Sequence, residues 1–166
     1  MAQLTRREIE SLITSADGRT VYLAGLDLVG VDLRGLSLRG ANLTSSVLKG
    51  ANLESVDLSV NPQSETASVL VRADLQDANL RGVKLHAANL AGAQLDGARL
   101  DGADLREANL APEGDDAASL CNASLVGADL RNANLTGADF TGANLSGAQL
   151  DGASTYGAKG LEPSEG

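Results

Sequence analysis

Leucine recurs at every fifth position over most of this chain, and a small or branched apolar residue stands two positions before it. The pattern is most regular from Ala73 to Leu110, which reads ADLQD, ANLRG, VKLHA, ANLAG, AQLDG, ARLDG, ADLRE and ANL. A period of five fits neither an α-helix, with 3.6 residues per turn, nor a strand, which alternates every two residues. On a helix, such leucines would advance about 140° beyond each full turn and circle the axis. The spacing therefore predicts a repeat architecture.

A rectangular coil accounts for this spacing. If each five residues form one short extended side followed by a bend, leucine and the small residue two before it point the same way, toward the coil axis. Alanine fits at the small position because leucines from four sides already fill the interior. Glycine at the fifth place, as at Gly82 and Gly92, suits a corner with unusual backbone angles. Asn or Asp just before leucine can bond nearby backbone groups at the bend.

The A-(D/N)-L-x-x pattern, which extends from about Val21 to Ala158, resembles the pentapeptide-repeat family. The resemblance implies an all-β solenoid, a right-handed quadrilateral β-helix. With about seven coils at the ordinary strand spacing, the rod would be roughly 30–35 Å long.

The first twenty residues have a different pattern and are predicted to form a helical cap. Residues 4–16 contain apolar positions at helical spacing, and Thr5 with Glu8 forms a capping-box signature. A solenoid exposes the core and the strand edges of its terminal coil, so some lid is required. We therefore expect a cap over residues 1–20, with a partner-binding helix as the alternative.

Two breaks interrupt the repeat. Leu58 and Leu70 are twelve residues apart, and the intervening polar, proline-containing stretch predicts a loop near 59–67. Around 111–117 one leucine is missing, so either one side is degenerate or five residues loop out. The predicted solenoid covers 21–158, and residues 159–166 are expected to form a C-terminal tail.

Net charge limits the possible partners. The formal charge of −9 argues against grip on nucleic acid or anionic membranes, which requires a basic surface. The charge is compatible with a basic protein partner. The alternative interpretation is that the charge serves only to keep the protein in solution. The N-terminus lacks an apolar signal core and no run approaches about 18 apolar residues, so we expect a cytoplasmic location.

The sequence offers no catalytic constellation. It has one histidine, His86, and one cysteine, Cys121, far apart, so a Cys–His pair or a His-rich metal site is not expected. The sequence thus predicts no enzyme activity, no cofactor and no metal. The leading hypothesis is a rigid scaffold for protein–protein interaction.

An acidic face is the candidate binding site. If each break still uses one side, positions twenty apart share a side, and one side carries Leu33, Leu53, Leu75 and Leu95. The carboxylates expected on that side are Asp32, Glu54, Asp74, Asp77, Asp96, Glu113, Asp115 and Asp116. Stacked along a rod, they would resemble the regularly spaced negative charge of duplex DNA.

This acidity, together with two interruptions, resembles the quinolone-resistance group within the family. The resemblance implies, as the alternative function, a DNA mimic that binds type II topoisomerase (DNA gyrase); that group dimerises through its C-terminal end. Independently of this resemblance, the sequence shows no C-terminal helix to cover the last coil, so we expect a homodimer through the C-terminal end. The chain departs from that group in its short C-terminal end and in having one phenylalanine, Phe140, at the central position.

Overall fold

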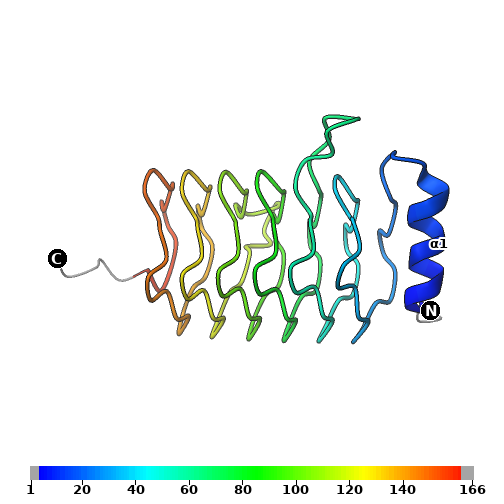
Figure 1. Ribbon diagram of the computed structural model, residues 1–166. Helices are drawn as coiled ribbons and strands as arrows, with labels where there is room; N and C mark the ends of the chain where they lie inside the picture. Colours follow the sequence, from blue (N-terminus) through cyan, green and yellow to red (C-terminus); the bar gives the residue numbers. More distant parts are fainter. Residues whose placement is uncertain (1–3, 162–166) are drawn as a thin grey trace.

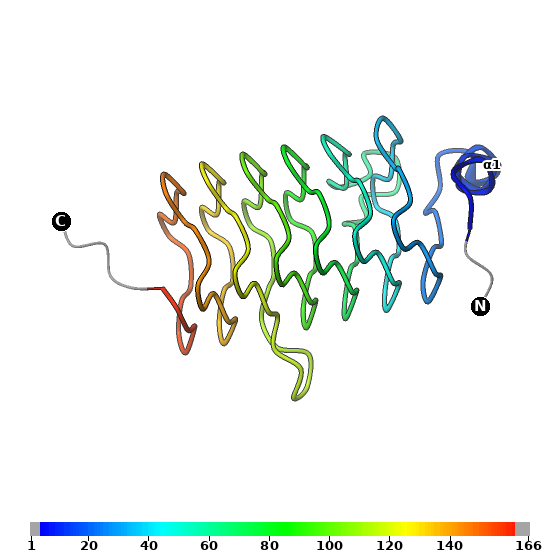
Figure 2. The ribbon, with the colours of Figure 1, turned by 90° about the horizontal axis from the view of Figure 1, so that it is seen from below.

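The computed structural model describes residues 4–161, which form a rod of stacked coils with a helix at one end (Figures 1 and 2). The helix, α1, spans Arg6–Ala16. In the described residues, the coils contain single bridged residues instead of continuous strands, because every side is only a few residues long. The N-terminal helix and the C-terminal coil lie at opposite ends of the rod.

Parallel bridges between successive coils arrange the residues just before each central leucine into four columns, here called sides 1 to 4. Side 1 is defined by Tyr22, Asn42, Val69, Asn89, Asn109, Asn134 and Ser154. Side 2 is defined by Asp27, Val47, Asp74, Gln94, Ser119, Asp139 and Lys159. Side 3 is defined by Asp32, Asn52, Asn79, Arg99, Ser124 and Asn144. Side 4 is defined by Ser37, Asp57, Lys84, Asp104, Asp129 and Gln149.

The interior of the rod is filled with apolar side chains. Central leucines such as Leu90 and the alanines two before them, such as Ala88, are fully buried. Backbone bonds join one coil to the next: the N–H of Leu90 donates to Asn109 at 2.8 Å, and that of Asn109 to Ala88 at 2.9 Å. A filled core leaves the outer sides and the two ends as the places where a partner can bind.

Asn and Asp before leucine have a structural task. Their side-chain oxygens accept a hydrogen bond from the N–H two residues later, as Asn42 does from Thr44 at 3.0 Å and Asp74 from Gln76 at 3.1 Å. Since an amide and a carboxylate serve this turn alike, the choice between them sets the surface charge of each side.

The capping box predicted at Thr5 is present. The Thr5 Oγ1 accepts from the Glu8 N–H at 3.4 Å, and the Glu8 carboxylate accepts from the Thr5 N–H at 2.7 Å. From α1, Ile9 is buried in the core. Arg6 donates to the carbonyls of Asp32 and Arg34 at 2.8 and 2.9 Å, so the cap pairs part of the first coil's open edge.

Both loops leave the rod at corners. Leu58 belongs to side 4 and Leu70 to side 1, the next side, so the 59–67 loop uses no side; an antiparallel bridge between Asn61 and Thr66 closes it. Leu110 and Leu120 likewise lie on consecutive sides, 1 and 2. Five residues therefore loop out around 111–117, which resolves the alternative left open by the sequence.

At the C-terminal end the last bridge joins Asp139 to Lys159, so residue 159 still pairs with the preceding coil. The tail predicted over 159–166 lies, from residue 162 onward, outside the described residues. Within 4–161, no helix has the length and apolarity needed to cross a membrane.

Candidate functional site

The predicted acidic residues lie on two sides of the rod. Six of them gather on side 2 and on the 111–117 loop beside it, namely Asp74, Asp77, Asp96, Glu113, Asp115 and Asp116. Asp32 and Glu54 belong to side 3 instead. The expectation of one common side is wrong because the loops protrude at corners: across the first loop the bridged spacing is 27 residues, as from Val47 to Asp74.

Side 2 also carries acids that the sequence interpretation missed. Asp27 and Asp139 stand in the same column as Asp74. Together with Asp77 and Asp96 they give side 2 five carboxylates, against two lysines, Lys49 and Lys159. Their repeat position was visible in the sequence, but assigning them to side 2 requires the correct register across both breaks. The Thr141 side chain and backbone donate to the Asp139 carboxylate and lower its pKa.

The 111–117 loop extends this acidic surface at the corner between sides 1 and 2. Arg72 forms an ion pair with Asp116 at 2.8 Å and donates to the Glu113 carbonyl at 3.2 Å. A Cβ on Gly92 would lie 3.1 Å from the Asp116 carbonyl oxygen, so the loop packs closely on this corner. Asp115 is exposed beside them. The loop is therefore held against the rod with carboxylates on its outer surface.

Asp96 differs from its neighbours because its carboxylate is used by the fold. It accepts hydrogen bonds from the Ser119 hydroxyl and, at 3.0 Å, from the Cys121 N–H. Position 119 has serine where most repeats have Asn or Asp, and Asp96 supplies the missing acceptor from the preceding coil. Its charge is therefore less available to a partner than that of the exposed Asp77.

Ion pairs offset most of the charge on sides 3 and 4. On side 3, Arg34 donates to the Asp32 carboxylate and lowers its pKa to about 2. On side 4, an ion-pair chain links alternating charges through Asp104–Arg106 at 2.7 Å, Arg106–Asp129 at 3.6 Å and Asp129–Arg131 at 2.7 Å. The arginine hydrogen bonds lower the pKa of both aspartates.

Side 1 is nearly uncharged along the described coils. Asparagine occupies four of its bridged positions, and Asn109 donates to the Asn89 side chain at 3.1 Å. Comparison of the four sides shows that the excess negative charge of the coils concentrates on side 2 and the 111–117 loop, here called the acidic surface. Such a surface attracts cationic groups.

The candidate reactive side chains lie on the outside of the rod. His86 is half-buried on side 4, with Nδ1 3.1 Å from the Arg106 carbonyl oxygen. Cys121 is half-buried on side 2, 3.4 Å from the Ser119 hydroxyl. Among residues 4–161, no cluster of three His, Cys, Asp or Glu side chains could hold a metal ion.

Among solved structures, this chain is similar to several pentapeptide-repeat proteins. HetL from the cyanobacterium Nostoc sp. strain PCC 7120, involved in heterocyst differentiation regulation, is 32% identical; the alignment covers 86% of this chain and 72% of HetL, with a TM-score of 0.48. Rfr23 from the cyanobacterium Cyanothece 51142 is 31% identical over 74% of this chain and 90% of Rfr23, with a TM-score of 0.49.

A more distant likeness is to QnrB1, a plasmid-mediated fluoroquinolone resistance protein. It is 21% identical over 80% of this chain and 73% of that structure, with a TM-score of 0.38. At this level of identity the likeness concerns the fold alone. A comparison with curated protein sequences found no significant match.

The family model for pentapeptide repeats matches in eight copies, over residues 22–59, 73–111 and 116–154. The gaps between these segments fall at the two loops, where the structure shows the repeat leaving the rod. The proteins of this family whose structures are known are right-handed β-helices. On this match over most of its length, together with the four-sided stacking of its coils, the chain belongs to the pentapeptide-repeat family.

Proposed function

We propose that this protein is a non-catalytic scaffold that binds a protein partner with a basic surface through the acidic surface. The observation that supports the proposal is the segregation of charge: side 1 is nearly neutral, sides 3 and 4 pair most of their charges internally, and side 2 keeps an excess of carboxylates. A rigid rod of about seven coils would present these groups at fixed spacing. Preorganised charge favours fast and specific association with a complementary surface.

Two triple variants test this role. Asp74→Asn, Asp77→Asn and Asp115→Asn neutralise the acidic surface while retaining side chains that can accept the turn hydrogen bonds. Glu65→Gln, Glu107→Gln and Asp151→Asn form the matched control, since they remove three exposed carboxylates elsewhere. Both variants change the net charge equally.

Each protein is immobilised and used to capture partners from a cytoplasmic extract, with quantification at low and high salt. The proposal expects partners that are lost with the Asp74 triple variant and at high salt, and kept by the control. Partners retained equally by both variants would contradict it. The cytoplasmic location is part of the proposal.

The second candidate is the DNA mimic that binds DNA gyrase. A specific observation favours it: Asp27, Asp74 and Asp139 stand in one column along the rod, with Asp77 and the 111–117 loop beside it. Over five coil steps this column is roughly 24 Å long at the strand spacing. A basic groove shaped for duplex DNA offers complementary charge over such a length.

This candidate is tested with DNA supercoiling by purified gyrase, with and without a quinolone. The DNA-mimic hypothesis expects inhibition or drug protection by the native protein and by the control triple variant, and loss of the effect with the Asp74 triple variant. No effect at micromolar native protein would exclude this candidate while leaving the scaffold proposal in place.

We also propose that two copies associate through the C-terminal end. In support, Leu145 and Leu150 of the last coil are only partly buried, whereas Leu125 and Leu130 of the preceding coil are fully buried. Association of two such ends would remove this apolar surface from water.

A further inference from the structure

The helical cap pairs only part of the first coil's edge. The Asp27 carbonyl accepts from the Leu4 N–H at 3.1 Å, and Arg6 serves two carbonyls of side 3. On side 4, Ser37 is exposed, and its backbone N–H and C=O bond no residue within 4–161. An extended segment with unpaired backbone groups is a template for the addition of another strand.

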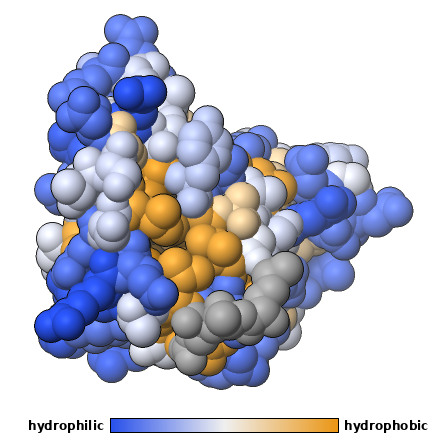
Figure 3. Space-filling model, turned by 90° about the vertical axis from the view of Figure 1, so that its right-hand side faces the viewer, coloured by the Kyte–Doolittle hydropathy of each residue, from blue (hydrophilic) through white to orange (hydrophobic). Residues whose placement is uncertain are grey.

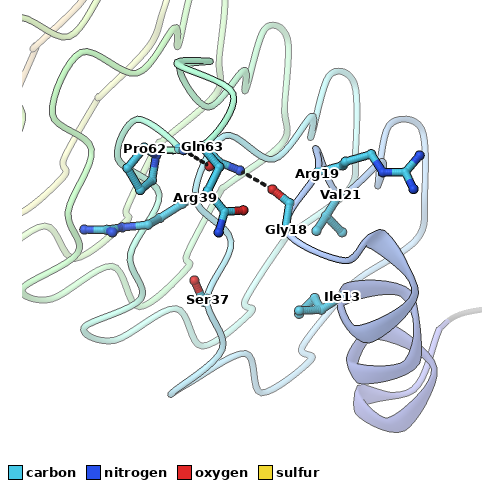
Figure 4. Close-up of a pocket in the computed structure, with 9 residues that line it drawn as sticks. Ile13, Gly18, Arg19, Val21, Ser37, Arg39, Pro62 and Gln63 are labelled. Carbon is cyan, nitrogen blue, oxygen red and sulfur yellow. Dashed lines mark hydrogen bonds between the residues drawn. The ribbon is translucent and has the colours of Figure 1, made fainter.

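A hollow lies beside this edge (Figure 4). It has a volume of about 260 Å³ and is lined by Ile13 of α1, by Val21 and Ser37 of the first coil, and by Pro62 and Gln63 of the 59–67 loop, among others. The space-filling view of this end of the rod shows apolar surface in its central part (Figure 3). The volume is below the 300–1,000 Å³ typical of sites for whole small molecules, so an inserted side chain fits it better.

The walls of the hollow are held in place by hydrogen bonds. Asn61 of the 59–67 loop is 6% exposed, donates to the Gly18 carbonyl at 3.0 Å, and accepts from the Gln63 N–H at 2.9 Å. The first bond fixes the loop to the linker that follows α1, and the second holds a turn within the loop. A preformed seat requires little ordering when a ligand binds, which favours affinity.

The charged residues that line the hollow are basic, opposite in sign to the net charge of the protein. The lining includes Arg19 and Arg39 and no carboxylate. Arg19 forms no ion pair with the part of the chain that is described, and Arg39 binds Asp57 through Nε at 2.9 Å. Figure 4 shows the two guanidinium groups pointing to opposite sides of the hollow. Asp57 offsets the charge of Arg39, so in a chain of net charge −9 Arg19 is the lining residue best able to attract an anionic group.

We propose that this end of the rod binds an extended acidic peptide segment of a protein partner. The peptide backbone pairs with the N–H and C=O of Ser37, an aliphatic side chain enters the hollow between Ile13 and Val21, and flanking carboxylates meet Arg19 and Arg39. The site is separate from the acidic surface and takes a ligand of opposite charge. It therefore stands or falls independently of the function proposed above.

The test uses the full chain and a fluorescent peptide, Glu-Ala-Val-Ala-Glu. In an extended peptide its two glutamates and the valine share one face, with about 14 Å between the glutamates. The charge-reversed peptide Lys-Ala-Val-Ala-Lys is the ligand control. Arg19→Glu is the test variant, and Arg7→Glu, an equal charge change at an exposed α1 residue outside the hollow, is its matched control.

We expect saturable binding of the acidic peptide in fluorescence anisotropy, at least tenfold weaker binding with Arg19→Glu, little change with Arg7→Glu, and no binding of the lysine peptide. Amide exchange measured by NMR should slow at Ser37 on binding, because its N–H becomes paired. Absence of binding up to 1 mM peptide, equal loss in both arginine variants, or an unchanged Ser37 exchange rate would overturn the proposal.

Discussion

The Oδ1 atom of Asp96 accepts a hydrogen bond from the backbone N–H of Cys121, 3.0 Å away on the next coil. In most repeats this N–H is served by the Asn or Asp two positions before it, within the same coil. Here that position is Ser119, whose own hydroxyl also donates to Asp96. The Asp96 carboxylate thus takes the place of the Asn or Asp acceptor that position 119 lacks, and it does so from the neighbouring coil.

Removing this acceptor should destabilise the protein. Asp96→Ala leaves the half-buried Cys121 N–H without its partner, and we expect a loss of about 1–3 kcal/mol in the free energy of unfolding. Adding Ser119→Asn should recover much of the loss, because the introduced amide oxygen would accept the bond as Asn42 does for Thr44. Urea unfolding of the native protein, the single variant and the double variant measures both effects. A double variant no more stable than Asp96→Ala would refute this assignment.

The fold was predictable from the sequence because the repeat encodes it at each position. Leucine every five residues, alanine two before it and the Thr5–Glu8 capping box each specify a local geometry that the structure confirms. The composition of the candidate site was less predictable. A loop of unknown path between Leu58 and Leu70 shifts every later residue to a neighbouring side, and only the coil-to-coil bridges fix that shift.

A central leucine should contribute more to the free energy of unfolding in the middle of the rod than at its end. Leu90 is fully buried between neighbouring coils, whereas Leu150 in the last coil is partly exposed. Leu90→Ala should cost about 3–5 kcal/mol, because the cavity cannot collapse between rigid coils, and Leu150→Ala less than half as much when the protein is diluted until the two copies are separate. Chemical denaturation gives both values. Equal costs would show that the last coil is as well covered as the inner ones.

Acid should weaken the ion-pair chain on side 4. Arginine hydrogen bonds lower the pKa of Asp104 and Asp129 in the folded state, and on side 3 they lower that of Asp32 to about 2. Since the unfolded value is about 3.9, the unfolded chain binds more protons in acid. The stabilisation is therefore fully present above about pH 5 and is lost as the pH falls through the folded pKa values.

Thermal unfolding between pH 7 and pH 2 measures this loss. Arg106→Gln removes a partner of both Asp104 and Asp129. We expect it to lower Tm at pH 7 and to make the fall in Tm between pH 5 and pH 2 smaller than in the native protein. A fall in Tm of the same size in both proteins would mean that the ion pairs of Arg106 contribute nothing to stability.

The proposed association of two copies predicts a mass change from a single substitution. Leu150→Glu places a charge on the partly exposed apolar surface of the last coil. Light scattering should give a dimer mass for the native protein and a monomer mass for the variant, with circular dichroism confirming that the coils remain folded. Val126→Glu, at an exposed apolar position on side 3, is the control and should leave the dimer mass unchanged.

The acidic surface exists only if the 59–67 loop uses no side of the coil. Asp74 then stacks on Val47 of side 2; if the loop took up one side, Asp74 would stack on Asn52 instead. Stacked residues are about 4.8 Å apart, within the Cα range of 4.4–6.8 Å for disulfides. Cysteine pairs at these positions, in a Cys121→Ser background, distinguish the two arrangements.

The decisive measurement is therefore the rate of cross-linking under mild oxidation, or with a short thiol cross-linker, of the folded Val47→Cys/Asp74→Cys and Asn52→Cys/Asp74→Cys proteins. Rapid bond formation in the first pair and none in the second is the predicted result. Preferential cross-linking of the second pair would place Asp74 on side 3 instead of side 2. That result would contradict the acidic surface described above.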